Sequence, residues 1–81
     1  MGGIKVLLFG AAADRAGTHE TQVPAGEITL DELWPLLAKR HPGLSPMRET
    51  LAFAVNDEYA RMEDTISPGD EVAVLPPVSG G

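Results

Sequence analysis

The run Glu71-Val72-Ala73-Val74-Leu75 alternates its side chains with the two-residue period of a β-strand, placing Val72 and Val74 on the inner face and Ala73 and Leu75 on the outer face. A second apolar run, Ile4-Lys5-Val6-Leu7-Leu8-Phe9, lies near the start of the chain. Strands this apolar are usually buried in the middle of a sheet. The two runs therefore predict that the first and last strands pair side by side at the centre of a mixed sheet.

One helix is predicted to cover this sheet. Thr29-Leu30-Asp31-Glu32 matches the capping box, in which the first and fourth side chains bond free backbone N–H groups at a helix start. Pro42-Gly43 ends the pattern. Pro35 conflicts with it because proline lacks the N–H of a helix interior, so we expect the helix either to kink there or to begin nearer Trp34. The apolar positions at helical spacing are Leu30, Leu33, Trp34, Leu37 and Ala38.

Shorter strands and turns fill the rest of the chain. Residues 19–23 and 51–55 are predicted strands, and residues 59–61 form a short return strand after a tight turn at Asn56-Asp57. Ser67-Pro68-Gly69-Asp70 has Pro and Gly where a type II turn requires them. Residues 10–18 are predicted to be a loop, and residues 44–50 an irregular segment with one helical turn after Pro46.

The predicted order is therefore strand, strand, helix, strand, short strand, strand. This order fits the α+β class and, within it, the β-grasp arrangement, which is the fold of ubiquitin. We expect a mixed sheet of about five strands packed on one main helix. The predicted domain spans residues 1–75, and residues 76–81 form a flexible C-terminal tail.

The composition narrows the possible functions. A chain of 81 residues forms one small domain. Its net charge of −6 argues against a nucleic-acid partner and favours basic partner surfaces. The absence of cysteine excludes disulfides, thiolate metal sites and a cysteine nucleophile. No signal peptide is apparent, and the longest apolar run is too short to span a bilayer, so a cytoplasmic location without membrane association is expected.

The final residues, Pro76-Pro77-Val78-Ser79-Gly80-Gly81, form a distinctive tail. Two prolines stiffen its root, and two glycines without a Cβ keep its tip narrow. The functional interpretation is a stiff neck and a slim tip that place the Gly81 carboxylate in the active site of a partner. The alternative is an ordinary frayed terminus.

Apolar residues also lie on the outer face of the predicted sheet. Leu7 and Phe9 share that face with Lys5, which marks it as solvent-facing. Together with Leu75 and Tyr59 they are predicted to form a docking patch around the root of the tail. The alternative is that an irregular loop covers them.

Three segments carry a resemblance to a known family. They are Ala54-Val55-Asn56, Ser67-Pro68-Gly69-Asp70-Glu71-Val72 and Leu75-Pro76-Pro77-Val78-Ser79-Gly80-Gly81. Together they resemble the ubiquitin-like sulfur carriers of the MoaD/ThiS family, and within that family the MoaD-type small subunits of molybdopterin synthase. The resemblance covers the whole chain in length and element order, and the double proline favours this branch over the thiamine-pathway carriers. Pro35 departs from the family pattern.

The resemblance implies a non-catalytic sulfur-carrier subunit. An activating enzyme would use ATP to adenylate Gly81, and a sulfur donor protein would supply the sulfur of a C-terminal thiocarboxylate. The carrier would then bind the large subunit, in an assembly of two large and two small subunits. There it would donate sulfur to cyclic pyranopterin monophosphate, forming the molybdopterin dithiolene. Gly80 and Gly81 would carry the reacting end, and the chain itself would bind no cofactor. Partner contacts would come from Pro76, Pro77, Val78 and Ser79.

Two other functions fit the same tail. One is sulfur delivery to another pathway, such as thiazole, cysteine or tRNA thiolation. The other is a ubiquitin-like modifier that is conjugated through Gly81. The three differ in the product that they make.

Other candidate sites are explained more simply. His19 and His41 lack ligand-like spacing, so no metal site is expected. Asp31-Glu32 fits helix capping, and Asp57-Glu58 fits a solvated turn. Asp70-Glu71, expected beside the root of the tail, serves either the turn or a contact with basic partner residues.

Overall fold

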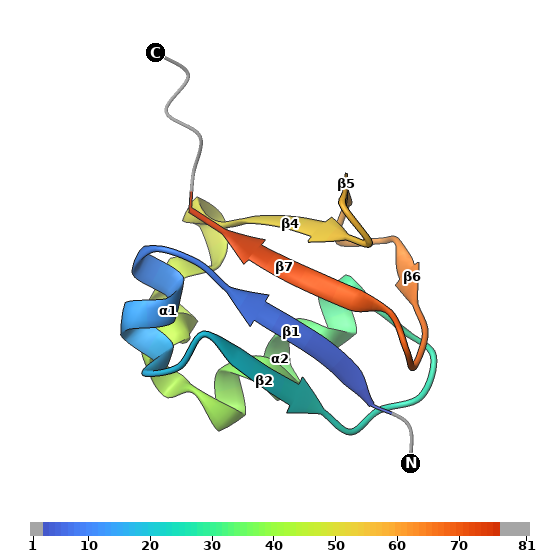
Figure 1. Cartoon of the computed structure of the whole chain (residues 1–81), viewed down its shortest axis with the longest axis horizontal. Coiled ribbons are helices and arrows are strands. Elements are labelled where there is room, and N and C mark those ends of the chain that lie inside the picture. The colour runs from blue at the N-terminus through green and yellow to red at the C-terminus, as the bar shows by residue number, and fades with distance from the viewer. Residues whose placement is uncertain (1–2, 77–81) are drawn as a thin grey trace.

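The first and last strands lie side by side at the centre of the sheet, which confirms the prediction made from their apolar character (Figure 1). The computed structural model describes residues 3–76. The two strands run parallel, with Val6 opposite Val72 and Leu8 opposite Val74, and the other neighbouring pairs are antiparallel. In order across the sheet, the strands are β2 (Glu20–Val23), β1 (Ile4–Leu8), β7 (Glu71–Leu75), β4 (Ala52–Val55) and β5 (Glu58–Tyr59).

The core lies between this sheet and the helices behind it (Figure 1). The inner side chains of β1 and β7 are fully buried, as their alternation predicts. Helix α2 (Leu30–Arg40) buries Leu33 and Leu37 against them. Trp34 meets Phe53 of β4 edge to face, with ring centroids 5.8 Å apart. This is a favourable geometry for an aromatic pair, and it joins the helix to the sheet.

The capping box forms at the start of α2 as predicted. The Glu32 N–H donates to Thr29 Oγ1 at 3.2 Å, and the Thr29 N–H donates to Glu32 Oε1 at 2.9 Å. The alternative start near Trp34 is therefore wrong, because the helix begins at Leu30. Pro35 lies in the second turn and is exposed. The backbone carbonyl that it leaves without an N–H partner belongs to Asp31, an exposed residue, which limits the cost.

The predicted loop at residues 10–18 is wrong, because residues Ala11–Ala16 form helix α1. A helix this short is not stable alone. Packing supports it, since Ala12 and Ala13 are buried. Gly17 ends the helix in the left-handed conformation, and its N–H donates to the Ala13 carbonyl at 2.8 Å. The alanines favour a helix, and the flanking glycines, which are equally typical of a loop, mark the two ends of that helix.

The segment after α2 is more regular than predicted. It forms a 3-10 helix, η1 (Pro42–Thr50), which starts at Pro42 rather than after Pro46. Gly43 allows η1 to approach α1, because a Cβ at this position would collide with the Arg15 backbone carbonyl. The two short helices therefore pack at a point where only glycine fits.

A second, two-stranded sheet was not predicted. Its strands are β3 (Ile28–Thr29) and β6 (Thr65–Ile66). Next to it, the Leu30 and Asp31 N–H groups donate to the carbonyls of Asp64 and Met62, which satisfies free donors at the start of α2. Two-residue strands carry too little pattern to be recognised in a sequence.

The predicted turns are confirmed. Asn56 and Asp57 have φ values of 51° and 73°, as the tight turn between β4 and β5 requires. Gly69 has φ of 96°, and the Asp70 N–H donates to the Ser67 carbonyl at 2.9 Å. The return strand covers Glu58–Tyr59 rather than residues 59–61. Within residues 3–76, no helix has both the length and the apolar character needed to cross a membrane.

Candidate functional site on the outer sheet face

The four residues predicted to form the docking patch surround one hollow on the outer face of the sheet. Leu7, Phe9, Tyr59 and Leu75 all line a cavity of about 300 Å³. Leu7 belongs to β1 and Phe9 follows that strand, while Tyr59 belongs to β5 and Leu75 to β7. Phe9 is 44% exposed and Tyr59 is 72% exposed. No segment among residues 3–76 covers these two rings, which contradicts the alternative of burial beneath a loop. We call this cavity the sheet hollow.

Two alanines form the floor of the sheet hollow. Leu7 lies opposite Ala73, Ala73 lies opposite Ala54, and Ala54 lies opposite Tyr59. This cross-strand row has a large side chain at each end and two alanine methyl groups in the middle, which leaves a depression between Leu7 and Tyr59. Ala54 was missed as a site residue. Two alanines at matching register were the available signal, but the register itself could not be read from the sequence.

The tail leaves the sheet beside this hollow. Leu75 ends β7, and Pro76 follows it at the point where β1 passes into Gly10. Gly10 has φ 57° and ψ −133°, a combination that other residues rarely adopt. A Cβ on Gly10 would lie 3.3 Å from Pro76 Cγ. Glycine at this position therefore lets the root of the tail pack closely against the end of β1. Residues Pro77, Val78, Ser79, Gly80 and Gly81, predicted to form the working tail, lie outside the described residues.

Charged side chains lie next to the sheet hollow on the outer face, with Lys5 and Glu71 at the end farther from the tail and Glu20 opposite Leu7. Lys5 lies 3.7 Å from a Glu71 carboxylate oxygen and 3.9 Å from one of Glu20. These ion pairs are well exposed, so they contribute little to stability. Asp57 and Glu71 line the rim of the sheet hollow. An apolar floor with a partly acidic rim suits a partner surface that presents apolar groups flanked by basic ones.

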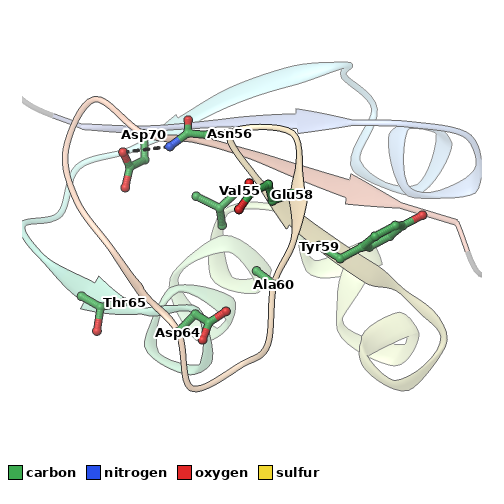
Figure 2. Close-up of a pocket in the computed structure, with 8 residues that line it drawn as sticks. All are labelled: Val55, Asn56, Glu58, Tyr59, Ala60, Asp64, Thr65 and Asp70. Atoms are coloured by element: carbon green, nitrogen blue, oxygen red, sulfur yellow. Dashed lines mark hydrogen bonds between the residues drawn. The ribbon is translucent and has the colours of Figure 1, made fainter.

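The placement predicted for Asp70-Glu71 beside the root of the tail is wrong. Asp70 precedes Glu71 at the start of β7, the long strand next to β1 in Figure 1, whereas Pro76 follows Leu75 at the other end of that strand. Asp70 instead lies on the rim of a wider hollow of about 540 Å³, shown in Figure 2. Its carboxylate accepts hydrogen bonds from Asn56 Nδ2 at 3.2 Å and from the Ser67 N–H at 2.8 Å. The interpretation of Asp70 as a turn residue is therefore confirmed.

A second carboxylate in Figure 2 has a similar structural role. Asp64 accepts a hydrogen bond from the Arg61 N–H at 2.9 Å, which closes the turn before β6. The remaining carboxylate, Glu58, extends from the exposed strand β5. Within the described part of the chain, no group of three or more His, Asp or Glu side chains could hold a metal ion.

The fold and the site together define a class of protein. A mixed five-stranded sheet packed on one main helix, with a tail that leaves the central strand, is the architecture of the ubiquitin-like β-grasp proteins. Residues 6–81 match the ThiS family. The chain belongs to this family.

Three relatives show how close the similarity is. The chain is 42% identical to the molybdopterin synthase sulfur carrier subunit of Homo sapiens, over 96% of this chain and 93% of that protein. It superposes on SAMP1 from Haloferax volcanii with a TM-score of 0.87 at 29% identity, covering 99% and 100% of the two chains. It also matches a chain in the complex of subunits 1 and 2 of molybdopterin-converting factor from Helicobacter pylori, with a TM-score of 0.70, 28% identity and coverage of 98% and 99%.

Proposed function

We propose that this chain is the sulfur-carrier subunit of a molybdopterin synthase and serves molybdenum cofactor biosynthesis. The observation that carries the proposal is nearly full-length similarity to a sulfur carrier subunit of that enzyme. The sheet hollow adds a physical basis, because it is an uncovered apolar surface beside the root of the Gly-Gly tail. The partner is the large subunit of the synthase, as the complex of subunits 1 and 2 from Helicobacter pylori suggests.

The sheet hollow is the proposed docking surface for the large subunit. Tyr59, Phe9, Leu7 and Leu75 surround a floor of alanines, so an apolar side chain of the partner can enter between them. Contact at this point orients the tail, since Pro76 follows the end of the central strand β7, where Leu75 lines the sheet hollow, and packs against Gly10. Pro77, Val78 and Ser79 then follow the partner's channel, and the stiff proline pair reduces the conformational entropy lost on entry.

Gly81 is the proposed site of the chemistry. A carboxylate is a poor acyl donor and must first be activated. On the activating enzyme, the Gly81 carboxylate attacks ATP, which releases pyrophosphate and forms an acyl adenylate. Hydrosulfide from the sulfur donor then attacks the carbonyl carbon, AMP leaves, and a thiocarboxylate remains. In the synthase, the thiocarboxylate sulfur bonds to cyclic pyranopterin monophosphate, water then cleaves the acyl–sulfur bond and regenerates the Gly81 carboxylate, and two such transfers build the dithiolene. Gly80 keeps the tip narrow, because any Cβ there would widen it.

The catalytic groups belong to the partners in this scheme. ATP is bound by the activating enzyme, sulfur comes from a donor protein, and two large and two small subunits form the synthase. We place the reaction in the cytoplasm. The chain itself supplies position and sulfur.

Product analysis tests the proposal. The chain is loaded with sulfur by its activating enzyme and mixed with the large subunit and cyclic pyranopterin monophosphate. The expected result is molybdopterin, with two loaded carriers consumed for each dithiolene. Transfer to another acceptor would assign the carrier to a different thiolation pathway. Conjugates to lysines of other proteins would establish a modifier instead. That class appears in the full name of the structural relative SAMP1 of Haloferax volcanii, which is small archaeal modifier protein 1.

A further inference from the structure

A groove between the edge of the sheet and helix α2 is not explained by the proposed function. It has a volume of about 420 Å³ and is lined by Val23 and Pro24 at the end of β2, and by Leu36, Lys39 and Arg40 on α2. Leu36 is 40% exposed. The other two exposed large apolar side chains among residues 3–76, Phe9 and Tyr59, belong to the sheet hollow. Leu36 is therefore an exposed apolar side chain that the proposed docking of the large subunit at the sheet hollow does not explain.

Strand β2 is an open edge of the five-stranded sheet (Figure 1). Gln22 lies opposite Lys5 of β1. The Lys5 N–H donates to the Asp70 carbonyl, away from β2 and toward the β7 side. Because hydrogen-bonded and non-hydrogen-bonded pairs alternate in an antiparallel ladder, the Gln22 N–H and C=O must point outward. Neither group has a hydrogen-bond partner among residues 3–76.

The rest of this edge is closed. The Glu20 N–H and C=O both bond to the Thr18 hydroxyl, at 3.4 Å and 3.0 Å. Pro24 has no N–H to offer. The backbone N–H and C=O of Gln22 are therefore the pair available on this edge, and Gln22 directly precedes Val23 and Pro24, which line the groove. An extended segment of another chain could pair with Gln22 and place alternate side chains in the groove.

The charge of the groove indicates what that segment carries. The protein has six Lys and Arg residues against twelve Asp and Glu. Lys5, Arg48 and Arg61 form ion pairs. Lys39 and Arg40 form none within residues 3–76, and both line the groove. An unpaired cationic rim in a protein of net charge −6 is complementary to acidic side chains. The apolar lining and the net charge favour a protein segment over nucleic acid.

We propose that the groove between β2 and α2 binds an extended aliphatic segment of a protein partner, flanked by acidic residues, which pairs with Gln22 as an added strand. Its aliphatic side chains pack on the exposed Pro24 and Leu36, next to the buried Val23, and its carboxylates meet Lys39 and Arg40. This surface involves the free edge strand β2 and the exposed face of α2, whereas the sheet hollow lies on the outer face over β1, β7, β4 and β5. A second partner could therefore bind while the tail is engaged.

The test is an NMR titration of the full ¹⁵N-labelled chain with the peptide acetyl-Ser-Ile-Val-Ile-Asp-Glu-Ser-amide. A matched peptide carries Asn and Gln in place of Asp and Glu. We expect saturable shifts at Gln22, Leu36, Lys39 and Arg40, and slower hydrogen exchange of the Gln22 amide. The double variant Lys39→Glu with Arg40→Glu should weaken binding by about tenfold, since two exposed ion pairs are lost.

Control variants keep the result interpretable. Arg15→Glu makes one such charge reversal, half the change of the double variant, at an exposed residue that forms no ion pair within residues 3–76 and does not line the groove. The affinity of this variant should stay within about twofold of wild type. Lys39→Gln with Arg40→Gln removes the charges without adding repulsion, in case the reversal unfolds the last turn of α2. Leu36→Ser tests the apolar contact separately.

Several outcomes would overturn the proposal. No saturable shift, or shifts confined to Leu7, Phe9 and Tyr59, would remove the groove as a binding site. Equal affinity for the neutral peptide would remove the acidic requirement. The same shifts on addition of inorganic phosphate or an oligonucleotide would reassign the groove to anions. Groove shifts that depend on protein concentration alone would assign it to a second copy of the chain. None of these results bears on the tail, so the proposed function is tested separately.

Discussion

Truncation of Tyr59 to alanine tests whether the sheet hollow is the docking surface for the large subunit. Tyr59 is 72% exposed. A tyrosine side chain offers about 200 Å² for burial, so about 140 Å² of it would leave water on docking. At ~25 cal/mol per Å² that area is worth about 3.5 kcal/mol. Because area converts incompletely into affinity, we expect a loss of about 2–3.5 kcal/mol, which raises the Kd about 30- to 300-fold.

The same substitution should change stability much less. The part of the ring already buried amounts to about 60 Å², so the free energy of unfolding should fall by at most about 1.5 kcal/mol. Calorimetric titration of the large subunit gives the affinity, and urea unfolding gives the stability. Leu36→Ala is the control, because Leu36 is an exposed apolar residue on α2 outside the sheet hollow. A Tyr59→Ala protein that is folded and binds within about threefold of wild type would refute this docking surface.

Three further predictions concern the same surface, the root of the tail and the main helix. Phe9→Asp should weaken large-subunit binding more than it lowers stability, because it places a charge against the apolar partner surface; unchanged calorimetric affinity would contradict this. Gly10→Ala should lower the free energy of unfolding by about 2 kcal/mol, from backbone strain, and should slow sulfur transfer by displacing Pro76. Gly17→Ala is the control, because Gly17 also has a positive φ, of 79°, but has open space around it. This substitution should lower the free energy of unfolding by about 1 kcal/mol and leave sulfur transfer unchanged. Equal transfer rates in the two variants would exclude a role for Gly10 in orienting the tail. Thr29→Ala should cost about 1 kcal/mol in urea unfolding through loss of the cap, and a loss below about 0.3 kcal/mol would mean that tertiary contacts alone set the start of α2.

Elements whose signals are local were predicted well from the sequence. The capping box at Thr29, the turn residues Asn56 and Asp57, and the alternation of β1 and β7 all specify their structure within a few residues. The central pairing of β1 with β7 is not local. It was predictable because only a central position buries two strands that are this apolar.

Elements that depend on tertiary contacts were missed. Helix α1 is too short to be stable without the packing of Ala12 and Ala13. The two-residue strands β3 and β6 exist because their segments meet beside the start of α2. Neither case leaves a periodic pattern in the sequence.

The candidate site was predicted in its large side chains but not in its shape. Leu7, Phe9, Tyr59 and Leu75 are recognisable as apolar residues on a solvent-facing surface. The floor of Ala73 and Ala54 requires the register between β7 and β4, which depends on the whole sheet. Asp70 was misplaced for a related reason: it is close to the tail in sequence, but one strand length separates them in space.

The central claim, that Gly81 carries sulfur, is tested most directly by the intact mass of the chain after incubation with an activating enzyme, ATP and sulfide. We expect a mass gain equal to the exchange of one oxygen for one sulfur, located at Gly81 by fragmentation and dependent on ATP. An unchanged mass, with no pyrophosphate released while a known carrier is loaded in parallel, would contradict the claim.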